Sequence, residues 1–273
     1  MVTAPKKKPA AKKTPKVAAK SKPVRAASGK RAAPGADDVV ATLRRMGSKA
    51  ARDGMARYAI PSDRAFGIAM GAMQKYAKEL GRSHELALAL WETGWYEART
   101  VAAFVDEIEK VTPAQMDRWA AEFDSWAICD TVCFTLFDRS PHALPKVEKW
   151  AKSREEFVKR AGYALLACVA LHDRTTGDEA FLRFFPLLEA GAADERNFVK
   201  KGVLWAIRGV GGRSTALRDE ALRLAGRLAD SPVASARWVG KTALREMEGS
   251  AAAERLARKA RREAPEGSAR RKR

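Results

Sequence analysis

Three short segments of the chain share one pattern and recur at a nearly constant interval. They read Phe157-Val-Lys-Arg160, Phe198-Val-Lys-Lys201 and Trp238-Val-Gly-Lys241, which makes Arg160, Lys201 and Lys241 equivalent positions spaced 41 and 40 residues apart. A repeat of this length accommodates two helices and their turns. Each pair would bury its apolar face against the next pair, so the interval predicts a stack of helix pairs.

Helical signals continue from Asp37 to about Ser250, whereas alternating runs of β-branched residues bounded by hairpin turns are missing. Hydroxyl side chains that can accept a hydrogen bond from the first turn mark the expected helix starts. These starts are Ser62, Ser83, Thr112, Ser140, Ser153 and Ser231. The sequence therefore predicts an all-α fold, a HEAT-like helical-repeat solenoid.

Both ends of the chain are strongly basic. Of the net charge of +19, residues 1–36 supply eleven lysines and arginines without an acid, and residues 254–273 supply nine against three acids. The expected domains are a disordered Lys/Ala/Pro-rich tail at 1–36, a helical domain at 37–250 and a basic tail at 251–273. The tails suit a salt-sensitive tether to nucleic acid, or they serve only solubility.

Several classes of protein are not indicated. The cysteines Cys129, Cys133 and Cys168 are odd in number and lack metal-ligand spacing, so we expect core residues in a reducing compartment. Scattered His84, His142 and His172 receive no role. Without an apolar run of membrane-spanning length or a signal peptide, we expect no membrane association, no metal and a cytoplasmic protein.

A run from Phe123 to Phe137 carries the clearest chemistry. In a single helix, Trp126 and Asp130 share a face, which Phe134 and Phe137 continue. A carboxylate among aromatic side chains is either paired with a buried cation or kept for catalysis, because burial without a partner raises its pKa. Both interpretations stay open from the residues alone.

Two further stretches are expected to begin the next helices of the inner row, Trp150 to Leu166 and Asn197 to Arg208. If consecutive inner helices line one groove, Arg160 and Trp205 converge on Trp126 and Asp130. Arg160, Lys201 and Lys241 would then form a cationic row along that groove. Such a row suits a DNA backbone, or it is a solvated line of charges at helix ends.

Residues 37 to about 250 resemble the DNA alkylation repair family of AlkD-like alkylpurine DNA glycosylases. The motifs are Trp126-x-x-x-Asp130, the stretch from Trp150 to Arg160, and the segment Phe-Val-Lys-Lys-x-x-x-Trp-Ala-Ile-Arg that ends at Arg208. The resemblance implies HEAT-like repeats that wrap duplex DNA in a concave basic groove. Two features depart from the family pattern. Lys159 stands where the family often has an arginine, and a run of glycines follows Arg208.

What the resemblance implies is cofactor-free hydrolysis of the N-glycosidic bond of positively charged N3- or N7-alkylpurines. It assigns catalysis to Asp130, Trp126 and Trp205, and DNA binding to Arg160; Lys201, Arg208 and Lys241 extend the basic groove. We expect a monomer bound to alkylated duplex DNA in the nucleoid. The alternative is a non-catalytic HEAT-repeat protein that recognises damaged or branched DNA.

Overall fold

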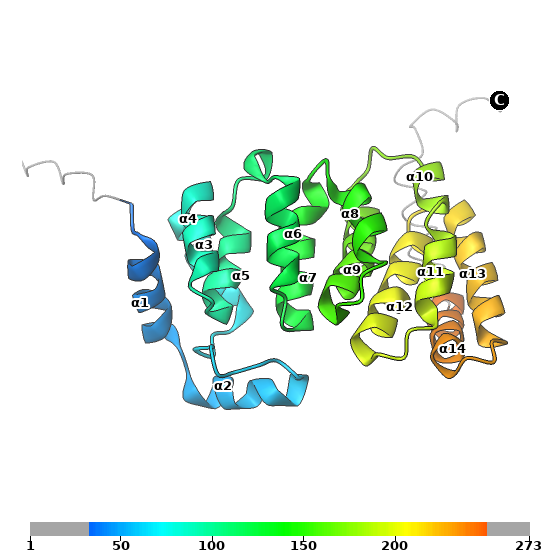
Figure 1. The fold of residues 1–273 in the computed structure, drawn as a ribbon, viewed down its shortest axis with the longest axis horizontal. Helices are drawn as coiled ribbons and strands as arrows, with labels where there is room; N and C mark the ends of the chain where they lie inside the picture. The colour runs from blue at the N-terminus through cyan, green and yellow to red at the C-terminus, as the bar shows by residue number, and fades with distance from the viewer. Residues whose placement is uncertain (1–32, 250–273) are drawn as a thin grey trace, which may run out of the picture. The chain divides into compact units, whose positions relative to one another are not determined.

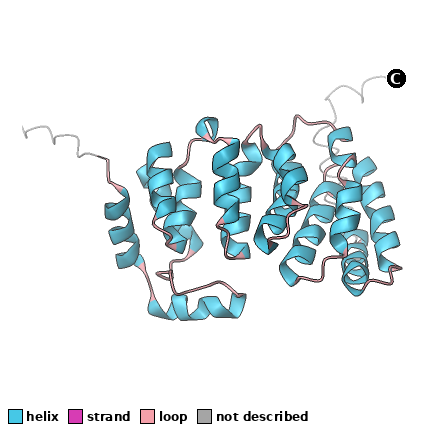
Figure 2. Ribbon diagram, in the orientation of Figure 1, coloured by secondary structure: helices cyan, strands magenta, loops and turns pink. Residues whose placement is uncertain are grey.

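A computed structural model describes residues 33–249, and within this range the chain forms helices and turns but no strand. The all-α prediction is therefore confirmed (Figures 1 and 2). Most of the tail at 1–36 and the whole of the tail at 251–273 lie outside the described residues.

The domain begins with short helices and ends with long ones. Its first part contains α1 (Ala36–Met46), α2 (Lys49–Gly54), η1 (Met55–Tyr58), α3 (Met70–Leu80), α4 (His84–Glu92), α5 (Tyr96–Val105), η2 (Ile108–Lys110) and α6 (Pro113–Ala121). Its second part contains α7 (Trp126–Thr135), η3 (Phe137–Arg139), α8 (Ala143–Trp150), α9 (Glu156–His172), α10 (Glu179–Leu182), α11 (Phe185–Ala192), α12 (Asn197–Gly211), α13 (Thr215–Ala229) and α14 (Ala234–Glu248).

The helices alternate between two layers, as expected for HEAT-like repeats. One layer is the inner row, in which α5 packs on α7, α7 on α9, α9 on α12, and α12 on α14. The other layer contains α4, α6, α8, α11 and α13, and α8 and α13 pack on α9 and α14 of the inner row. Figure 1 shows the helices succeeding one another in chain order along the domain.

Side-chain contacts join the helices of the outer layer to one another. The indole of Trp91 in α4 stacks on that of Trp119 in α6, with ring centroids 4.0 Å apart. Trp150 in α8 donates its indole N–H to Asp117 in α6 over 2.9 Å. Trp91, Trp119 and Trp150 are all buried, so these large apolar rings hold successive repeats together.

Helix α9 is the central element of the domain. Every residue from Arg160 to Ala170 is buried. Gly162 allows this packing, because a Cβ there would lie 2.5 Å from the backbone nitrogen of Ala151 at the end of α8. Cys129, Cys133 and Cys168 are buried free thiols, as expected.

Five of the six predicted helix starts fall into two groups. Ser83 and Thr112 cap α4 and α6 by accepting from the backbone of Leu86 and Gln115. Ser140, Ser153 and Ser231 instead accept from the amide two residues later, and in each case the helix begins three residues after the serine. The hydroxyl therefore shapes the turn that enters the helix rather than its cap.

Three other local predictions were wrong. No helix starts at Ser62, because residues 59–69 form an irregular segment. The expected helix at 123–137 is shorter, since α7 ends at Thr135 and the buried Phe137 belongs to η3. Trp150 ends α8 of the outer layer rather than beginning an inner helix, and α9 starts six residues later at Glu156.

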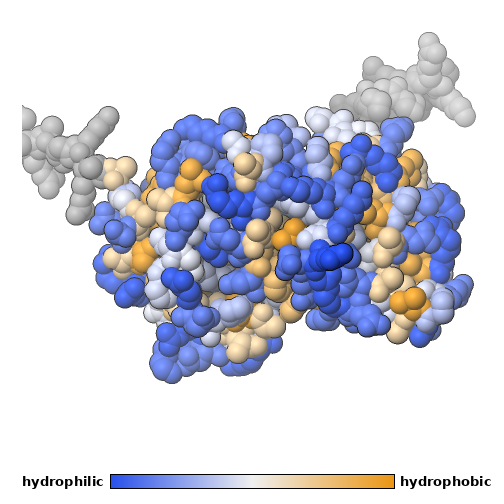
Figure 3. Space-filling model, viewed as in Figure 1, coloured by the Kyte–Doolittle hydropathy of each residue, from blue (hydrophilic) through white to orange (hydrophobic). Residues whose placement is uncertain are grey.

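The surface in the view of Figure 3 is largely hydrophilic, with hydrophobic residues in small groups. Between residues 33 and 249, no helix has both the length and the apolar character needed to cross a bilayer.

Candidate active site and nucleic-acid interface

Asp130 and Arg160 form a bidentate ion pair between α7 and α9. Arg160 donates from Nε to Oδ1 over 2.9 Å and from Nη2 to Oδ2 over 2.7 Å. Its remaining terminal nitrogen, Nη1, donates to the carbonyl oxygen of Phe198 in α12 over 2.7 Å. Arg160 thus joins three consecutive helices of the inner row.

The pair is mostly withdrawn from solvent. The side chain of Asp130 is 18 % exposed and that of Arg160 is 8 % exposed. Burial raises the pKa of the Asp130 carboxyl above its usual range, and the hydrogen bonds and charge of Arg160 act in the opposite direction. Burial lowers the pKa of Arg160, but Asp130 outweighs that effect and the net change is upward. Of the two interpretations of this acid, the structure shows the pairing with a buried cation.

Trp126 is the first residue of α7 and lies one turn before Asp130. Its indole N–H donates to the carbonyl oxygen of Tyr58 over 2.7 Å, which fixes the plane of the ring. The partner comes from η1, far earlier in the chain, so a segment outside the repeat pattern positions this tryptophan.

Residues 59–69, the irregular segment that follows η1, are fastened at the end far from Tyr58 by the buried carboxylate of Glu97 in α5. Glu97 accepts hydrogen bonds from the backbone amides of Phe66, Gly67 and Ile68, at 2.9, 2.7 and 3.3 Å. Gly67 has a φ of +81°, and a Cβ there would lie 2.4 Å from the carbonyl oxygen of Ser48. Only glycine fits this turn. Neither the role of Glu97 nor the course of this segment could be predicted from a motif in the sequence.

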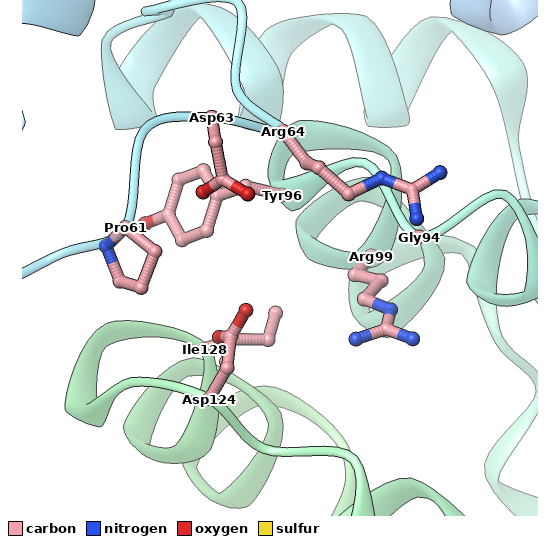
Figure 4. A pocket seen from close by; sticks show the side chains of 8 residues that line it. All are labelled: Pro61, Asp63, Arg64, Gly94, Tyr96, Arg99, Asp124 and Ile128. Carbon is pink, nitrogen blue, oxygen red and sulfur yellow. The ribbon is translucent and has the colours of Figure 1, made fainter.

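A small polar cavity separates the segment from the start of α7 (Figure 4). The cavity is lined by polar and charged side chains, those of Asp63, Arg64, Tyr96, Arg99 and Asp124. Its volume of about 50 Å³ suits a few water molecules, and a purine base would not fit. The cavity is therefore no preformed base pocket.

The candidate DNA-binding cations differ in their surroundings. Lys201 and Lys241 are exposed on α12 and α14. Arg208, also exposed, forms an ion pair with Glu246 of α14. Arg160 is buried in the pair with Asp130. The row predicted from the repeat therefore consists of one buried and two exposed cations.

Trp205 lies on α12, one turn after Lys201, and is half-buried against the core. In the described part of the chain, no hydrogen bond or ring contact joins it to Trp126 or Asp130. The structure thus brings Trp126, Asp130 and Arg160 together, while convergence of Trp205 on them remains a prediction.

Lys159 and two histidines have partners that the sequence did not reveal. Lys159 forms an ion pair with Asp194 over 2.9 Å, which joins α9 to the turn before α12. His84 bonds to the buried Asp106 over 2.6 Å, and His172 bonds to the buried Asp138. These pairs link helix ends. Residues distant in sequence supply each partner, so no short motif could identify them.

Within residues 33–249, no group of three or more His, Cys, Asp or Glu side chains could hold a metal ion. The chemistry available at the site is that of a fixed carboxylate, a guanidinium and an indole.

Comparison with known proteins agrees with the repeat architecture. One solved structure matches with a TM-score of 0.68 at 20 % identity, covering 82 % of this chain and 96 % of that chain. It belongs to a new family of proteins related to the HEAT-like repeat DNA glycosylases with affinity for branched DNA structures. A designed armadillo repeat protein is more distant, with a TM-score of 0.32 and 14 % identity over 64 % of this chain and 92 % of that one. No curated protein matched.

The fold is that of the HEAT-like repeat proteins related to DNA glycosylases. Residues 39–266 match the family described as DNA alkylation repair enzyme, and this chain belongs to that family. Its general role is therefore in DNA repair and DNA binding.

Proposed function

We propose that this protein is a monofunctional DNA glycosylase that hydrolyses the N-glycosidic bond of positively charged N3- or N7-alkylpurines in duplex DNA. The observation that carries the proposal is the Asp130 carboxylate, partly exposed, one helical turn from Trp126 and held through both oxygens by Arg160. Membership of the DNA alkylation repair family supports the same reaction class.

The chemistry requires little from the protein beyond negative charge in a fixed place. An alkylated purine is already cationic, so its bond to C1′ breaks with the electron pair leaving on the base, and no acid is needed. Positive charge then develops on the sugar, which a nearby carboxylate stabilises until water adds to C1′ and loses its proton. The indole of Trp126 offers a π-face to the same charge.

Arg160 acts in this proposal as a positioning residue. Each carboxylate oxygen of Asp130 accepts one hydrogen bond from Arg160 and retains a lone pair for substrate or water. The guanidinium also opposes the effect of burial on the pKa of Asp130 and so favours the charged carboxylate. Contact of Arg160 with a DNA phosphate remains a prediction from the sequence.

The proposed DNA contacts outside the catalytic residues are Lys201, Arg208 and Lys241, with Trp205 beside them on α12. Lys201 and Lys241 are exposed, and Arg208 would exchange Glu246 for a phosphate. Replacing Lys201 or Lys241 with alanine should weaken binding to any duplex sequence, and each should reduce the salt dependence by about one phosphate contact.

The proposed organisation is a helical repair domain at 37–250, with basic tails at 1–36 and 251–273 as loose tethers to DNA. It would act as a monomer on alkylated duplex DNA in the nucleoid, without a cofactor.

The test is incubation of the full chain with duplex DNA that carries either cationic N3- and N7-methylpurines or a neutral O6-alkylguanine. We expect release of the cationic bases, retention of the neutral one and abasic sites without strand cleavage. Release of the neutral adduct alone, or of no base, would contradict the proposal. Quantifying free bases by mass spectrometry makes the outcomes distinct.

A binding-only function is the second candidate, and two observations favour it. Both oxygens of Asp130 are already engaged by Arg160, and the related solved structure belongs to a family with affinity for branched DNA structures. This candidate predicts salt-dependent DNA binding by the wild type without release of any base.

A further inference from the structure

The surface formed by α12 and α14 is rich in cations and carries two indoles. We call it the α12–α14 surface and define it by Lys200, Lys201, Trp205, Arg208, Trp238, Lys241 and Arg245. The surface has five cations, whereas α12 carries no acid and α14 carries two glutamates. Glu246 pairs with Arg208, and Glu248 is exposed at the end of α14. The excess of positive charge suits a polyanion.

Trp238 is the most unusual residue of this surface. It is the fifth residue of α14 and remains 38 % exposed, whereas Trp91, Trp119 and Trp150 are fully buried in the repeat contacts. More than a third of this large apolar side chain is therefore open to solvent. This open part of the ring is available to an aromatic ligand.

The neighbourhood of Trp238 is positively charged, which suits a negatively charged aromatic ligand. The Nζ of Lys200 lies 5.3 Å from the ring centroid, a cation–π geometry. Lys241 lies one turn further along α14, and Lys201 follows Lys200 on α12; both are exposed. An aromatic surface with cations on two sides is the arrangement that binds single-stranded nucleic acid.

The repeat shows how this position differs from its equivalents. Trp238 corresponds to Phe157 and Phe198, whose rings are 5.4 Å apart and half-buried against each other. Those two rings pack together between α9 and α12. In α14, the last described helix, the equivalent ring is the larger tryptophan and is more exposed.

We propose that Trp238 stacks on an unpaired nucleobase, while Lys201 and Lys241 hold the phosphates that flank it. In an intact duplex both faces of every base are covered by neighbours, so only a nucleotide outside the base stack can reach the indole. This inference rests on the DNA binding of the proposed function. It adds a contact on α14, separate from Asp130 on α7.

The test compares the full-length wild type with Trp238→Leu and Trp238→Phe. Leucine removes the aromatic face but keeps an apolar side chain at this position of α14. Phenylalanine keeps an aromatic face. Leu182→Ala is the matched control, because Leu182 is a similarly exposed hydrophobic residue on α10, at 42 %. Affinity is measured by fluorescence anisotropy for an intact duplex and for the same duplex with a short single-stranded gap.

We expect the wild type to prefer the gapped DNA. Trp238→Leu should weaken binding to the gapped DNA by at least about fivefold and change intact duplex binding less than about twofold. Trp238→Phe should retain most of the preference, and Leu182→Ala should match the wild type. Equal effects of Trp238→Leu on both DNAs, or no effect on either, would overturn the inference and leave duplex binding intact. If the wild type binds neither DNA, the proposed function fails with it.

Discussion

Arg160 holds both carboxylate oxygens of Asp130 and, with its third nitrogen, the carbonyl of Phe198. One buried side chain therefore fixes the candidate catalytic acid and connects α7, α9 and α12. The pair is structural and, in the proposed mechanism, also functional, so stability and activity must be measured separately.

Replacing Arg160 with alanine would leave the Asp130 carboxylate buried without its partner. We expect the free energy of unfolding to fall by about 3–5 kcal/mol, the usual cost of breaking one side of a buried ion pair. Urea unfolding at neutral pH measures it. Arg223→Ala is the control, because Arg223 pairs with Glu220 on the surface and should cost less than about 1 kcal/mol. Equal costs for the two variants would show that the buried Asp130–Arg160 pair adds no more to stability than a surface pair.

The sequence predicted the repeat architecture because it depends on local signals. The regular spacing of Arg160, Lys201 and Lys241 indicated pairs of helices, and the periodicity of apolar residues indicated the individual helices. The positions of helix starts were less accurate, because a serine can shape a turn before the helix as readily as cap it. Ser140, Ser153 and Ser231 show this difference.

Only part of the site could be predicted from the sequence, and the reason is physical. Trp126 and Asp130 share a helix face, which a sequence reveals, but their partners Tyr58 and Arg160 are 68 and 30 residues away. The partner of Trp126 is a backbone carbonyl, which every residue possesses. No side-chain pattern could therefore identify Tyr58.

The hydrogen bond between Trp126 and the Tyr58 carbonyl predicts a local change on removal of the indole N–H. Trp126→Phe keeps an aromatic ring but removes the N–H, which should release residues 55–63 at a cost of about 1 kcal/mol. Hydrogen exchange of these backbone amides should accelerate. Tyr58→Ala retains the carbonyl and should behave as the wild type. Unchanged exchange in Trp126→Phe would show that the bond does not hold this segment.

Glu97 should be essential for the conformation of residues 66–68. In Glu97→Gln, the amide group places N–H donors against backbone N–H groups that the carboxylate now satisfies, and we expect a loss of roughly 2 kcal/mol. Chemical unfolding and exchange at Phe66, Gly67 and Ile68 measure the effect. Glu92→Gln, at an exposed position on α4, is the control. Should both variants unfold like the wild type, the three bonds would have no net value.

Asp117 predicts how stability depends on pH. Burial raises the pKa of its carboxyl, but hydrogen bonds from Lys146, Lys149 and Trp150 outweigh burial and lower it to about 2, from an ordinary 3.8. A lowered folded-state pKa stabilises the fold above the ordinary value, and this contribution disappears as the pH falls toward 2. Asp117→Asn should therefore lower the Tm at neutral pH, with the difference shrinking in acid.

Thermal unfolding across this pH range checks the prediction. Asp219→Asn, at an exposed aspartate on α13, is the comparison and should show a smaller difference at neutral pH. A Tm difference for Asp117→Asn that stays constant from neutral to acid pH would rule out the linkage.

The central claim, that the Asp130 carboxylate stabilises positive charge on the sugar, is tested most directly by single-turnover release of a cationic alkylpurine. Asp130→Asn should release the base about a hundredfold more slowly or worse, with DNA affinity within about twofold of the wild type. Asp124→Asn, an exposed aspartate just before α7, should leave the rate unchanged. Release by Asp130→Asn at the wild-type rate, with equal DNA binding, would contradict the account.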